Sequence, residues 1–494
     1  MKFAKRLTVL SDAWSTPPMS RSRVLALAAS IALLGVPAVI GVTPAAAAPL
    51  TRTADPVVLT GADLPTLVNG VRTTIVGFRW TGSVWAQLPI QIDERAVVNF
   101  AKIYNNPSAV FYGSQPGLVN QLVYTSGNTW TGNDPDTKFD GNDELAFMAR
   151  DAGALSPGGS QPVGTAVGSG VQVRITDPLA AGAEGYVYLY RKAAGSVLSQ
   201  GAGKHYVKYA FKLLAGGYKT AYQLTSGPNL ENTLVTGASY RHHFVDRWAS
   251  DRLEVTTGGA TGVDILDRHK ALFAPGTCVR SEDTFDAPGP FGSSEGAFVT
   301  NKLGSVRAIR SYVGANSGPN TQRTHVFYDR REDIRTDLRV HSIGSIMDFM
   351  DYSPAATGMT YRNEFNQGGL TIDGIPDTPA GGVPSWEQVT GPQGTINQVG
   401  TLTTTWTPAS IVPYYLDDST PATAQCTGDA SAFGSSGVFI NSTLPVTDPA
   451  LGGTDRLSST RTLYFEAPGG TAADAIARRD QVLAPLTTVV NPAP

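Results

Sequence analysis

Short runs of alternating apolar and polar residues recur along most of the chain. Each run is rich in β-branched and aromatic residues and is bounded by Gly, Pro, Asn, Asp or Ser, which is typical of half-buried β-strands. Examples are TTIVGFRW, GVQVRITD, GYVYLYRK, HYVKYAFKLL, RLEVTT, THVFYDRR, DLRVHSI, GVFINSTL and RTLYFEAP. The pattern predicts a mostly β protein whose sheets are mainly antiparallel.

A helical pattern is clear only near the C-terminal end. The segment TAADAIARRDQVLAPL, from Thr471 to Leu486, follows two glycines and opens with a Thr-x-x-Asp capping signal. We therefore expect a short C-terminal helix there. A further helical turn is expected around Ile343–Met350.

The 494-residue chain is longer than one compact core usually requires, so we expect subdomains. The stretch from Asp151 to Gly170 is rich in Gly, Ser and Pro, which favours a linker. The expected organisation is a smaller N-terminal β module (48–155), a linker (156–169), a main antiparallel β-sandwich (170–466), and a C-terminal helix and tail (467–494).

The first 47 residues have the order of a secretory signal peptide. Basic residues precede the apolar run VLALAASIALLGVPAVIGV, and Ala45 and Ala47 then supply a small-residue cleavage site. The alternative interpretation is an uncleaved membrane anchor, because the apolar run is of marginal spanning length. Cleavage after Ala47 predicts a secreted protein, and no later segment is apolar and long enough to span a bilayer.

The charge balance argues against a nucleic-acid partner. Removal of residues 1–47 changes the net charge from −3 to −7, because they hold five basic side chains and one acidic side chain. Nucleic-acid binders neutralise phosphates with clustered Lys and Arg, and a mildly acidic chain lacks that excess.

The chain has two cysteines, Cys278 and Cys426. In an oxidising compartment an even pair favours a disulfide, which would stabilise the fold by about 3–5 kcal/mol according to the loop-entropy relation. A metal site or a catalytic thiol is the competing interpretation, and neither cysteine lies in a metal-ligand spacing.

An acidic loop, NDPDTKFDGNDE, precedes the expected strand LAFMAR. Its carboxylates could bind calcium, which needs six to eight oxygen ligands, although the match to an EF-hand is poor. The alternative is a solvated turn whose side chains bond their own backbone. The calcium interpretation rests on Asp134, Asp136, Asp140 and Asp143. We expect no organic cofactor.

Side chains that could take part in catalysis gather between His242 and Asp351. Arginines can bind a carboxylate or sulfate, and a His or Tyr can move a proton, which is the combination that β-elimination from a uronate needs. On a strand, Arg323 and His325 share a face, whereas adjacent histidines point to opposite faces. The catalytic candidates are His242, His243, His325, Tyr328, Arg323 and Arg247.

Each candidate also has a plain structural interpretation. Arg and Asp on neighbouring strands commonly form cross-strand pairs, and a lone His or Tyr in a sheet more often packs at the edge of a core. The GSSEG segment satisfies the G-x-S-x-G pattern at Ser294, but it lies in a loop before a strand, so a hydrolase nucleophile is not favoured.

The segment NKLGSVRAIRSYVGANSGPNTQRTHVFYDRREDIRTDLRVHSI, from Asn301 to Ile343, resembles a block in galactose-mutarotase-like β-supersandwich proteins of the polysaccharide lyase type. Upstream, LPIQIDER and FDGNDELAFMARDAG are similar to a PVQID…DELVF…D pattern of secreted proteins. The resemblance implies a large twisted antiparallel sandwich that binds a sugar polymer across its concave sheet.

Two functions follow as hypotheses. The first is a secreted enzyme that cleaves an extracellular polysaccharide by β-elimination or by hydrolysis, with Asp348/Asp351 or Glu282/Asp283 as the carboxylate pair of a hydrolase. The second is a non-catalytic carbohydrate-binding or cell-surface structural protein. Under either hypothesis the substrate-binding candidates are Arg307, Arg310, Trp386 and Tyr352.

Overall fold

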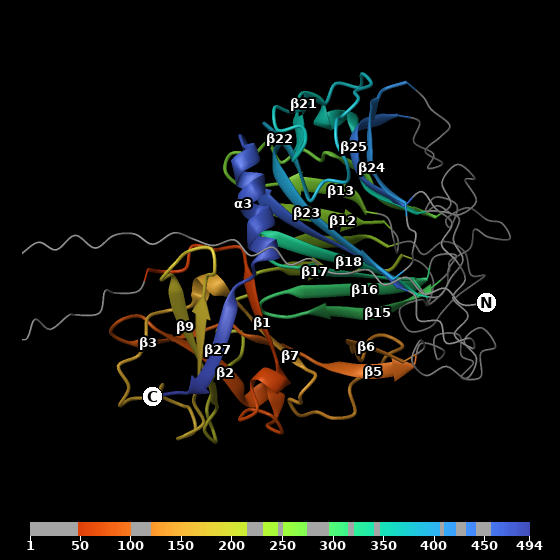
Figure 1. Cartoon of the computed structure of the whole chain (residues 1–494). Helices are drawn as coiled ribbons and strands as arrows, with labels where there is room; N and C mark the ends of the chain where they lie inside the picture. The colour runs from red at the N-terminus through yellow and green to blue at the C-terminus, as the bar shows by residue number, and fades with distance from the viewer. Residues whose placement is uncertain are drawn as a thin grey trace, which may run out of the picture. The chain divides into compact units, whose positions relative to one another are not determined.

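The computed structural model describes residues 48–99, 120–214, 231–245, 250–273, 296–314, 321–339, 346–405, 410–420, 431–440 and 456–494 (Figure 1). The fold is mostly β, and every strand pairing between the named strands is antiparallel, which confirms the predicted class. The predicted disulfide cannot be placed, because Cys278 and Cys426 lie outside the described residues.

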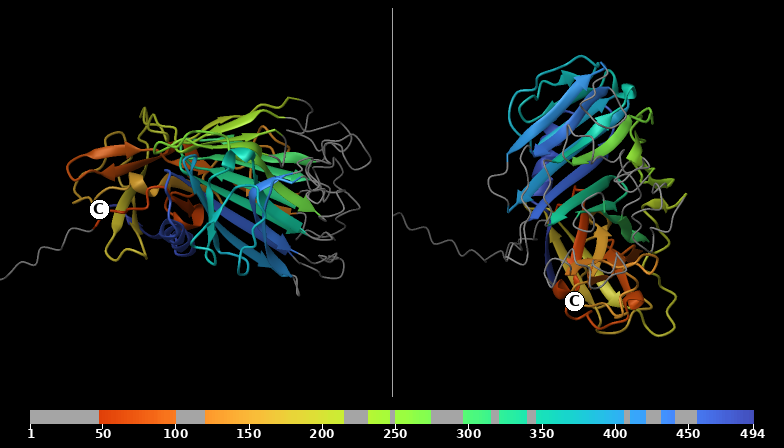
Figure 2. Two further views of the ribbon diagram at one scale, coloured as in Figure 1. Left: turned by 90° about the horizontal axis from the view of Figure 1, so that it is seen from above. Right: turned by 90° about the vertical axis from the view of Figure 1, so that its right-hand side faces the viewer.

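Two large sheets face each other and form a sandwich (Figure 1, Figure 2). In spatial order the eight-stranded sheet contains β10 (Lys208–Ala210), β11 (Thr233–Thr236), β12 (Tyr240–Phe244), β13 (Ser250–Val255), β14 (Leu266–Phe273), β19 (Ile346–Tyr352), β25 (Ala432–Ile440) and β24 (Ile411–Asp418). The nine-stranded sheet contains β15 (Gly296–Leu303), β16 (Ala308–Gly314), β17 (Thr321–Phe327), β18 (Arg331–Arg339), β26 (Arg456–Glu466), β23 (Gly394–Thr404), β22 (Trp386–Gly391), β20 (Thr360–Asn363) and β21 (Leu370–Thr371).

The inner faces of the two sheets share one apolar core. It joins Tyr240, Phe244 and Leu253 of the eight-stranded sheet to Phe327 and Phe465 of the nine-stranded sheet. The rings of Tyr240 and Phe465 stack with centroids 4.0 Å apart. Burial of one such side chain stabilises the fold by roughly 1.5–3 kcal/mol. The apolar side chains that alternate with polar ones along each strand therefore hold the two sheets together.

Among the described residues, three smaller sheets accompany the sandwich. The five-stranded sheet contains β27 (Thr487–Pro492), β8 (Val171–Thr176), β9 (Glu184–Arg191), β2 (Ile75–Trp80) and β3 (Trp85–Leu88). A three-stranded sheet contains β1 (Pro56–Thr60), β7 (Glu144–Met148) and β4 (Gln91–Asp93), and β5 (Arg95–Asn99) pairs with β6 (Asn120–Tyr124). Short 3₁₀ turns span Gly61–Asp63, Arg72–Thr74, Ala149–Asp151 and Pro354–Ala356.

The five-stranded sheet includes strands from both sides of the Gly-rich stretch that was expected to be a linker. β8 and β9 follow that stretch, β2 and β3 precede it, and β27 comes from the expected C-terminal tail. One face of this sheet packs on the three-stranded sheet through a second core that includes Leu145, Phe147, Val173 and Leu189.

The predicted C-terminal helix is α3 (Ala472–Leu483), and its capping signal works as expected. The Thr471 hydroxyl accepts from the Asp474 backbone N–H, and the Asp474 carboxylate accepts from the Thr471 backbone N–H. The helical turn expected at Ile343–Met350 is wrong in its described part, because Ile346–Tyr352 forms β19 between two partner strands.

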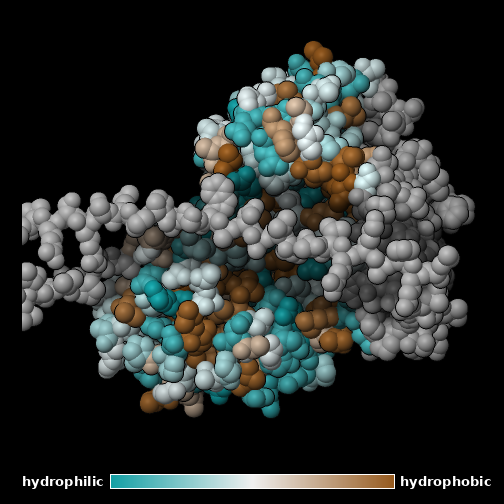
Figure 3. All heavy atoms as spheres, viewed as in Figure 1, coloured by the Kyte–Doolittle hydropathy of each residue, from teal (hydrophilic) through white to brown (hydrophobic). Residues whose placement is uncertain are grey.

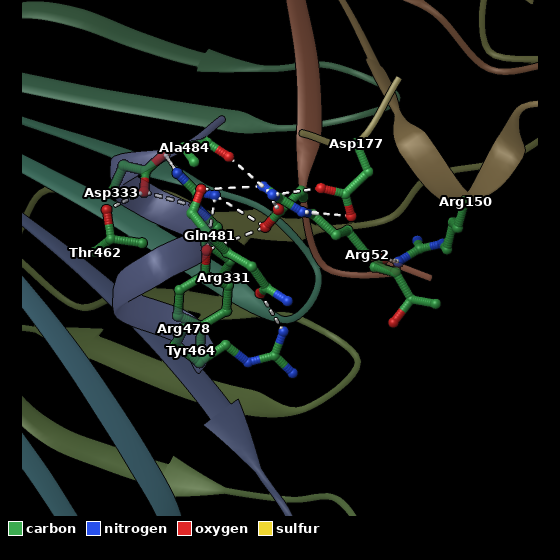
Figure 4. Close-up of polar contacts among 12 residues, drawn as sticks. Arg52, Arg150, Asp177, Arg331, Asp333, Thr462, Tyr464, Arg478, Gln481 and Ala484 are labelled. Atoms are coloured by element: carbon green, nitrogen blue, oxygen red, sulfur yellow. Dashed lines mark hydrogen bonds and ion pairs between the residues drawn. The ribbon is translucent and has the colours of Figure 1, made fainter. Parts of the chain in front are cut away.

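Arg52 ties the start of the described chain to the end of α3 (Figure 4). Its guanidinium is fully buried, pairs with Asp177 at 2.7 Å, and donates to the carbonyl oxygens of Gln481 and Ala484. A cation at a helix C-terminus satisfies the carbonyls that lack a partner within the helix. No helix among the described residues has the length and apolarity that a membrane crossing requires.

Candidate functional site

A polar groove of about 810 Å³ crosses the outer face of the nine-stranded sheet. Its floor is built by β17, β18, β26 and β23, and one wall comes from β6 and β7 together with Arg95 of β5. The floor-forming side chains are Gln322, Thr324, Val326, Arg331, Asp333, Arg335, Asp337, Thr403, Thr404, Ser458, Thr460 and Thr462. A groove of this size is in the range of ligand sites in proteins.

The strand register arranges these groups in rows that run across the sheet. Thr324 pairs with Arg335, and Arg335 pairs with Thr460, while the next row joins Gln322, Asp337 and Ser458. Because residues two apart on a strand share a face, β18 presents Arg331, Asp333, Arg335 and Asp337 to the groove and turns Glu332, Ile334 and Thr336 inward. Rows of hydroxyl, amide and charged groups on a rigid sheet can hydrogen-bond an extended polar ligand.

The charged groups on the groove floor are paired along β18. Arg331 binds Asp333 at 2.8 Å, and Arg335 binds Asp337 at 2.9 Å. Arg331 also binds Asp55 and donates to the Tyr464 hydroxyl, so further protein groups hold it in place (Figure 4). The Arg335 side chain, by contrast, is 62% exposed. Arg335 is therefore the basic side chain of the floor that a ligand reaches most readily.

The groove wall holds a tight cluster around Glu144. Tyr124 donates to Glu144 at 2.7 Å, and Arg95 and Arg307 each bind the same carboxylate at 2.7 Å. Burial and the neighbouring Glu144 raise the pKa of Tyr124, although Arg307 acts in the opposite direction, so the tyrosine keeps its proton. Arg95 is half-buried and faces the groove, while Arg307 is buried behind it.

Arg307, a predicted substrate-binding residue, is the centre of a buried ion-pair network. It binds Asp93 at 2.8 Å and also contacts the hydroxyl of Tyr328, a predicted catalytic residue, at 3.3 Å. Burial raises the pKa of Asp93, but the charges of Arg307 and Lys302 outweigh burial and lower it overall. Arg307 and Tyr328 are 2% exposed, so in this structure they support the wall from within.

Two of the predicted catalytic histidines meet in the interior of the sandwich. Nδ1 of His242 lies 2.8 Å from one oxygen of Glu332, and Nδ1 of His325 lies 2.7 Å from the other. The pKa of Glu332 is raised by burial but lowered more strongly by His242 and His325, to about 2, so the ionised carboxylate accepts from both rings. His242 and His325 thus lie in one cluster, and the side chains of His242, His325 and Glu332 are at most 1% exposed.

Other predicted arginines lie in the same interior. Arg323 binds Asp348 at 3.1 Å, and Arg461 binds the same carboxylate at 2.8 Å. Arg310 pairs with Glu231 and lies 4.3 Å from the ring centroid of Phe244. Burial lowers the pKa of His325 to about 4, and the nearby Arg310 and Arg323 contribute in the same direction. These groups cross-link the two sheets by paired charges.

His243 points away from the His242 cluster, as expected for adjacent strand residues. Its ring nitrogens lie 2.5 Å from Asp251 and 2.8 Å from Asn232.

The suggested hydrolase pair has separate partners, because Asp348 binds arginines whereas Asp351 accepts from Ser435. Trp386 and Tyr352 are 1% and 4% exposed, and Tyr352 packs in the main core.

The remaining predicted residues divide into two groups. Arg247, Glu282, Asp283 and Ser294 lie outside the described residues. In the acidic loop, Asp134, Asp136 and Asp140 each accept from the backbone N–H two residues ahead, and Asp143 accepts from Asp140 and Arg95. Within the described ranges no three His, Cys, Asp or Glu side chains are placed to hold a metal ion, and calcium stays a prediction.

Sequence reasoning missed the groove and Glu332. The signal for Glu332 was present, because in REDIRTD it shares a strand face with Ile334 and is thereby directed into the core. The same alternation places Arg331, Asp333, Arg335 and Asp337 together on the other face. The groove itself required the pairing of β18 with β26, which joins segments more than 100 residues apart, and the pairing of β26 with β23.

No protein-family profile matches the chain, and no curated protein matches it. Two solved structures are weak structural neighbours. One is a mutant of the heparan sulfate lyase HepC from Pedobacter heparinus, with TM-score 0.24, 10% identity and coverage of 61% of this chain; this chain spans 44% of the lyase. The other is described as an aldose 1-epimerase from Escherichia coli K12, with TM-score 0.24, 13% identity, and coverage of 53% of this chain and 100% of the epimerase. At this level of similarity neither structure assigns a function.

Proposed function

We propose that this chain is a secreted protein that binds an extracellular polysaccharide along the groove on the nine-stranded sheet. The observation that carries the proposal is the groove floor, where the paired charges of β18 are flanked by hydroxyl and amide groups of β17 on one side and hydroxyl groups of β26 and β23 on the other. A sugar polymer offers many hydroxyl groups in a row and needs many donors and acceptors in return. Secretion is proposed from the N-terminal segment of the sequence.

The lining of the groove, floor and wall together, favours a polymer with few charges. Arg331, Arg335 and Arg95 are each matched by a carboxylate within the groove, namely Asp333, Asp337 and Glu144. A densely anionic polymer would meet three carboxylates as well as three cations, so it gains little net attraction. Neutral or sparsely charged polysaccharides fit this lining better.

The test is affinity electrophoresis of the purified protein against a panel of neutral and uronate-containing polysaccharides. Arg335→Ala removes the exposed guanidinium from the floor and should weaken retention by about tenfold, the loss expected for one charge-assisted contact of about 1.4 kcal/mol. The matched control is Arg241→Ala, which removes an exposed arginine that pairs with Glu254 on the other sheet. Equal retention of both variants and of the parent protein would contradict the proposal.

A second candidate function is cleavage of the bound polymer by β-elimination. The observation that favours it is the wall cluster, in which a protonated Tyr124, the Glu144 carboxylate and the Arg95 guanidinium adjoin the groove. Elimination at a uronate moves the C5 proton to a base and breaks the C4–O bond, whose oxygen must gain a proton. Here Glu144 is the base, Tyr124 supplies the second proton, and Arg95 binds the uronate carboxylate.

Cleavage is tested by ultraviolet absorbance of unsaturated uronates and by reducing-end assays on the same polymers. Tyr124→Phe should abolish the absorbance change and leave retention in affinity electrophoresis unaltered. Reducing ends without new absorbance would indicate hydrolysis, and retention with neither signal would leave binding as the function.

A further inference from the structure

The five-stranded sheet carries an aromatic surface on the face opposite to its core. Residues two apart on β2 and β9 share this face, and β3 adds one more ring beside them. The rings belong to Phe78, Trp80, Trp85, Tyr186, Tyr188 and Tyr190, and they form a cluster separate from the module core. We call this set the aromatic face.

Trp85 lies at the centre of the aromatic face. Its ring centroid is 5.3 Å from that of Trp80, 4.9 Å from Tyr188 and 6.2 Å from Tyr190, each in an edge-to-face arrangement. The indole Nε1 donates to the hydroxyl of Ser160 at 3.3 Å. These contacts fix the indole plane of Trp85, and both tryptophans remain partly exposed while the tyrosines are buried.

An open hollow of about 390 Å³ lies against one of these rings, that of Tyr190, and against Ser160, which accepts the hydrogen bond from Trp85. The two tryptophans stand beside the hollow and do not line it. Its lining side chains are uncharged, and they come from Gly159, Ser160, Gln161, Gly168, Gly170, Tyr190 and residues 492–494. A Cβ atom at Gly170 would lie 2.5 Å from the Tyr190 ring, so a larger residue there would displace the ring or cover it. Glycines thus leave one wall of the hollow open, and the exposed Ser160 hydroxyl stands at its edge.

We propose that the hollow and the Trp80–Trp85 pair bind a pyranose ring of a neutral saccharide, as a second site separate from the groove. A sugar ring presents C–H groups that pack on an indole and hydroxyl groups that hydrogen-bond Ser160 and Gln161. A uronate or a sulfated sugar is disfavoured, because the lining side chains offer no cation to compensate a desolvated anion. The inference rests on the proposed function in one respect, which is that the ligand is a saccharide.

The experiment is isothermal titration of the full mature chain with neutral gluco-, galacto- and manno-oligosaccharides, together with tryptophan fluorescence. Trp85→Phe keeps an aromatic edge against Tyr188 and removes the larger stacking surface and the N–H. We expect at least one oligosaccharide to bind, with affinity about tenfold lower in this variant, which corresponds to about 1.4 kcal/mol. Trp130→Phe, which changes an indole packed in a different cluster, is the matched control and should bind normally.

A second variant guards against loss of folding. Ser160→Arg places a long side chain at the exposed edge of the hollow. It removes the acceptor of the Trp85 N–H but keeps the ring contacts of Trp85 with Trp80, Tyr188 and Tyr190, so it should abolish binding while circular dichroism stays unchanged. Absence of binding by every oligosaccharide to the folded parent protein overturns the proposal, as does equal affinity of Ser160→Arg and the parent.

The proposals for the two sites can be refuted separately. Arg335→Ala should reduce retention of polymers in the groove and leave titration by neutral oligosaccharides unchanged. If the oligosaccharides bind and Ser160→Arg removes that binding, the second site stands even when Arg335→Ala has no effect on polymers.

Discussion

The two faces of β18 use the same kinds of side chain for opposite purposes. The outward face bears Arg331, Asp333, Arg335 and Asp337, whose ion pairs line an open groove. The inward face bears Glu332, which two histidines hold inside the sandwich at distances of 2.7–2.8 Å. One strand of nine residues therefore supplies both the lining of an open groove and a buried cross-link between sheets.

The difference between the faces is one of solvent. An ion pair in water gains little, because both partners are already solvated, whereas a buried carboxylate must be fully compensated by its neighbours. Glu332 is compensated by His242 and His325, and Asp348 by Arg323 and Arg461. Histidine and arginine, which in the sequence suggested catalysis, are here the partners of buried acids.

The strongest test of this difference between the two faces is to remove one acidic side chain from each face of β18 and to compare the losses of stability. Glu332→Ala leaves two buried rings without their acceptor and should lower the free energy of unfolding by about 3–5 kcal/mol. Asp337→Ala on the outward face is the matched control and should cost less than about 1 kcal/mol. Urea denaturation followed by circular dichroism measures both, and a loss below about 1 kcal/mol for Glu332→Ala would refute the structural role of the buried cluster.

The buried cluster also predicts a dependence of stability on pH. The pKa of His325 falls from 6.5 to about 4 on folding, so the unfolded chain takes up a proton first as the pH falls. Stability should therefore decline between about pH 6.5 and pH 4, by up to about 3 kcal/mol. The pKa of Glu332 falls from 4.5 to about 2, so its contribution is present above pH 4.5 and is lost as the pH falls toward 2.

Urea midpoints at a series of pH values measure this effect. His325→Gln removes the histidine titration and should flatten the decline between about pH 6.5 and pH 4, while the loss below that range, which comes from carboxylates, persists. A parent protein whose midpoint stays constant over the upper range would contradict the assignment.

The smallest effect is expected from the groove pair itself. A double-mutant cycle on Arg335 and Asp337 should give a coupling energy below about 1 kcal/mol, reduced further by salt, because the arginine side chain is 62% exposed. The same cycle on Arg323 and Asp348, whose side chains are 1% and 8% exposed, should give a larger and salt-insensitive coupling. Equal couplings would remove the contrast between the two faces.

The local pattern of the sequence determined much of this protein. Alternation in segments such as GYVYLYRK and THVFYDRR predicts strands, because a half-buried strand needs one apolar face, and the Thr471–Asp474 capping signal marks the start of α3. The same local rule correctly placed Arg323 and His325 on one face and separated His242 from His243. These features depend only on neighbours within a few residues.

Tertiary structure alone decided which charged residues became interior partners and which became a surface. Glu332 and His242 are 90 residues apart, and Tyr124 and Arg307 meet at the groove wall only because β6 lies against the large sheet. The charge of a side chain can be read from the sequence, but its role depends on whether water or a buried partner solvates it. That choice is made by strand pairing over long separations, which the local pattern does not encode.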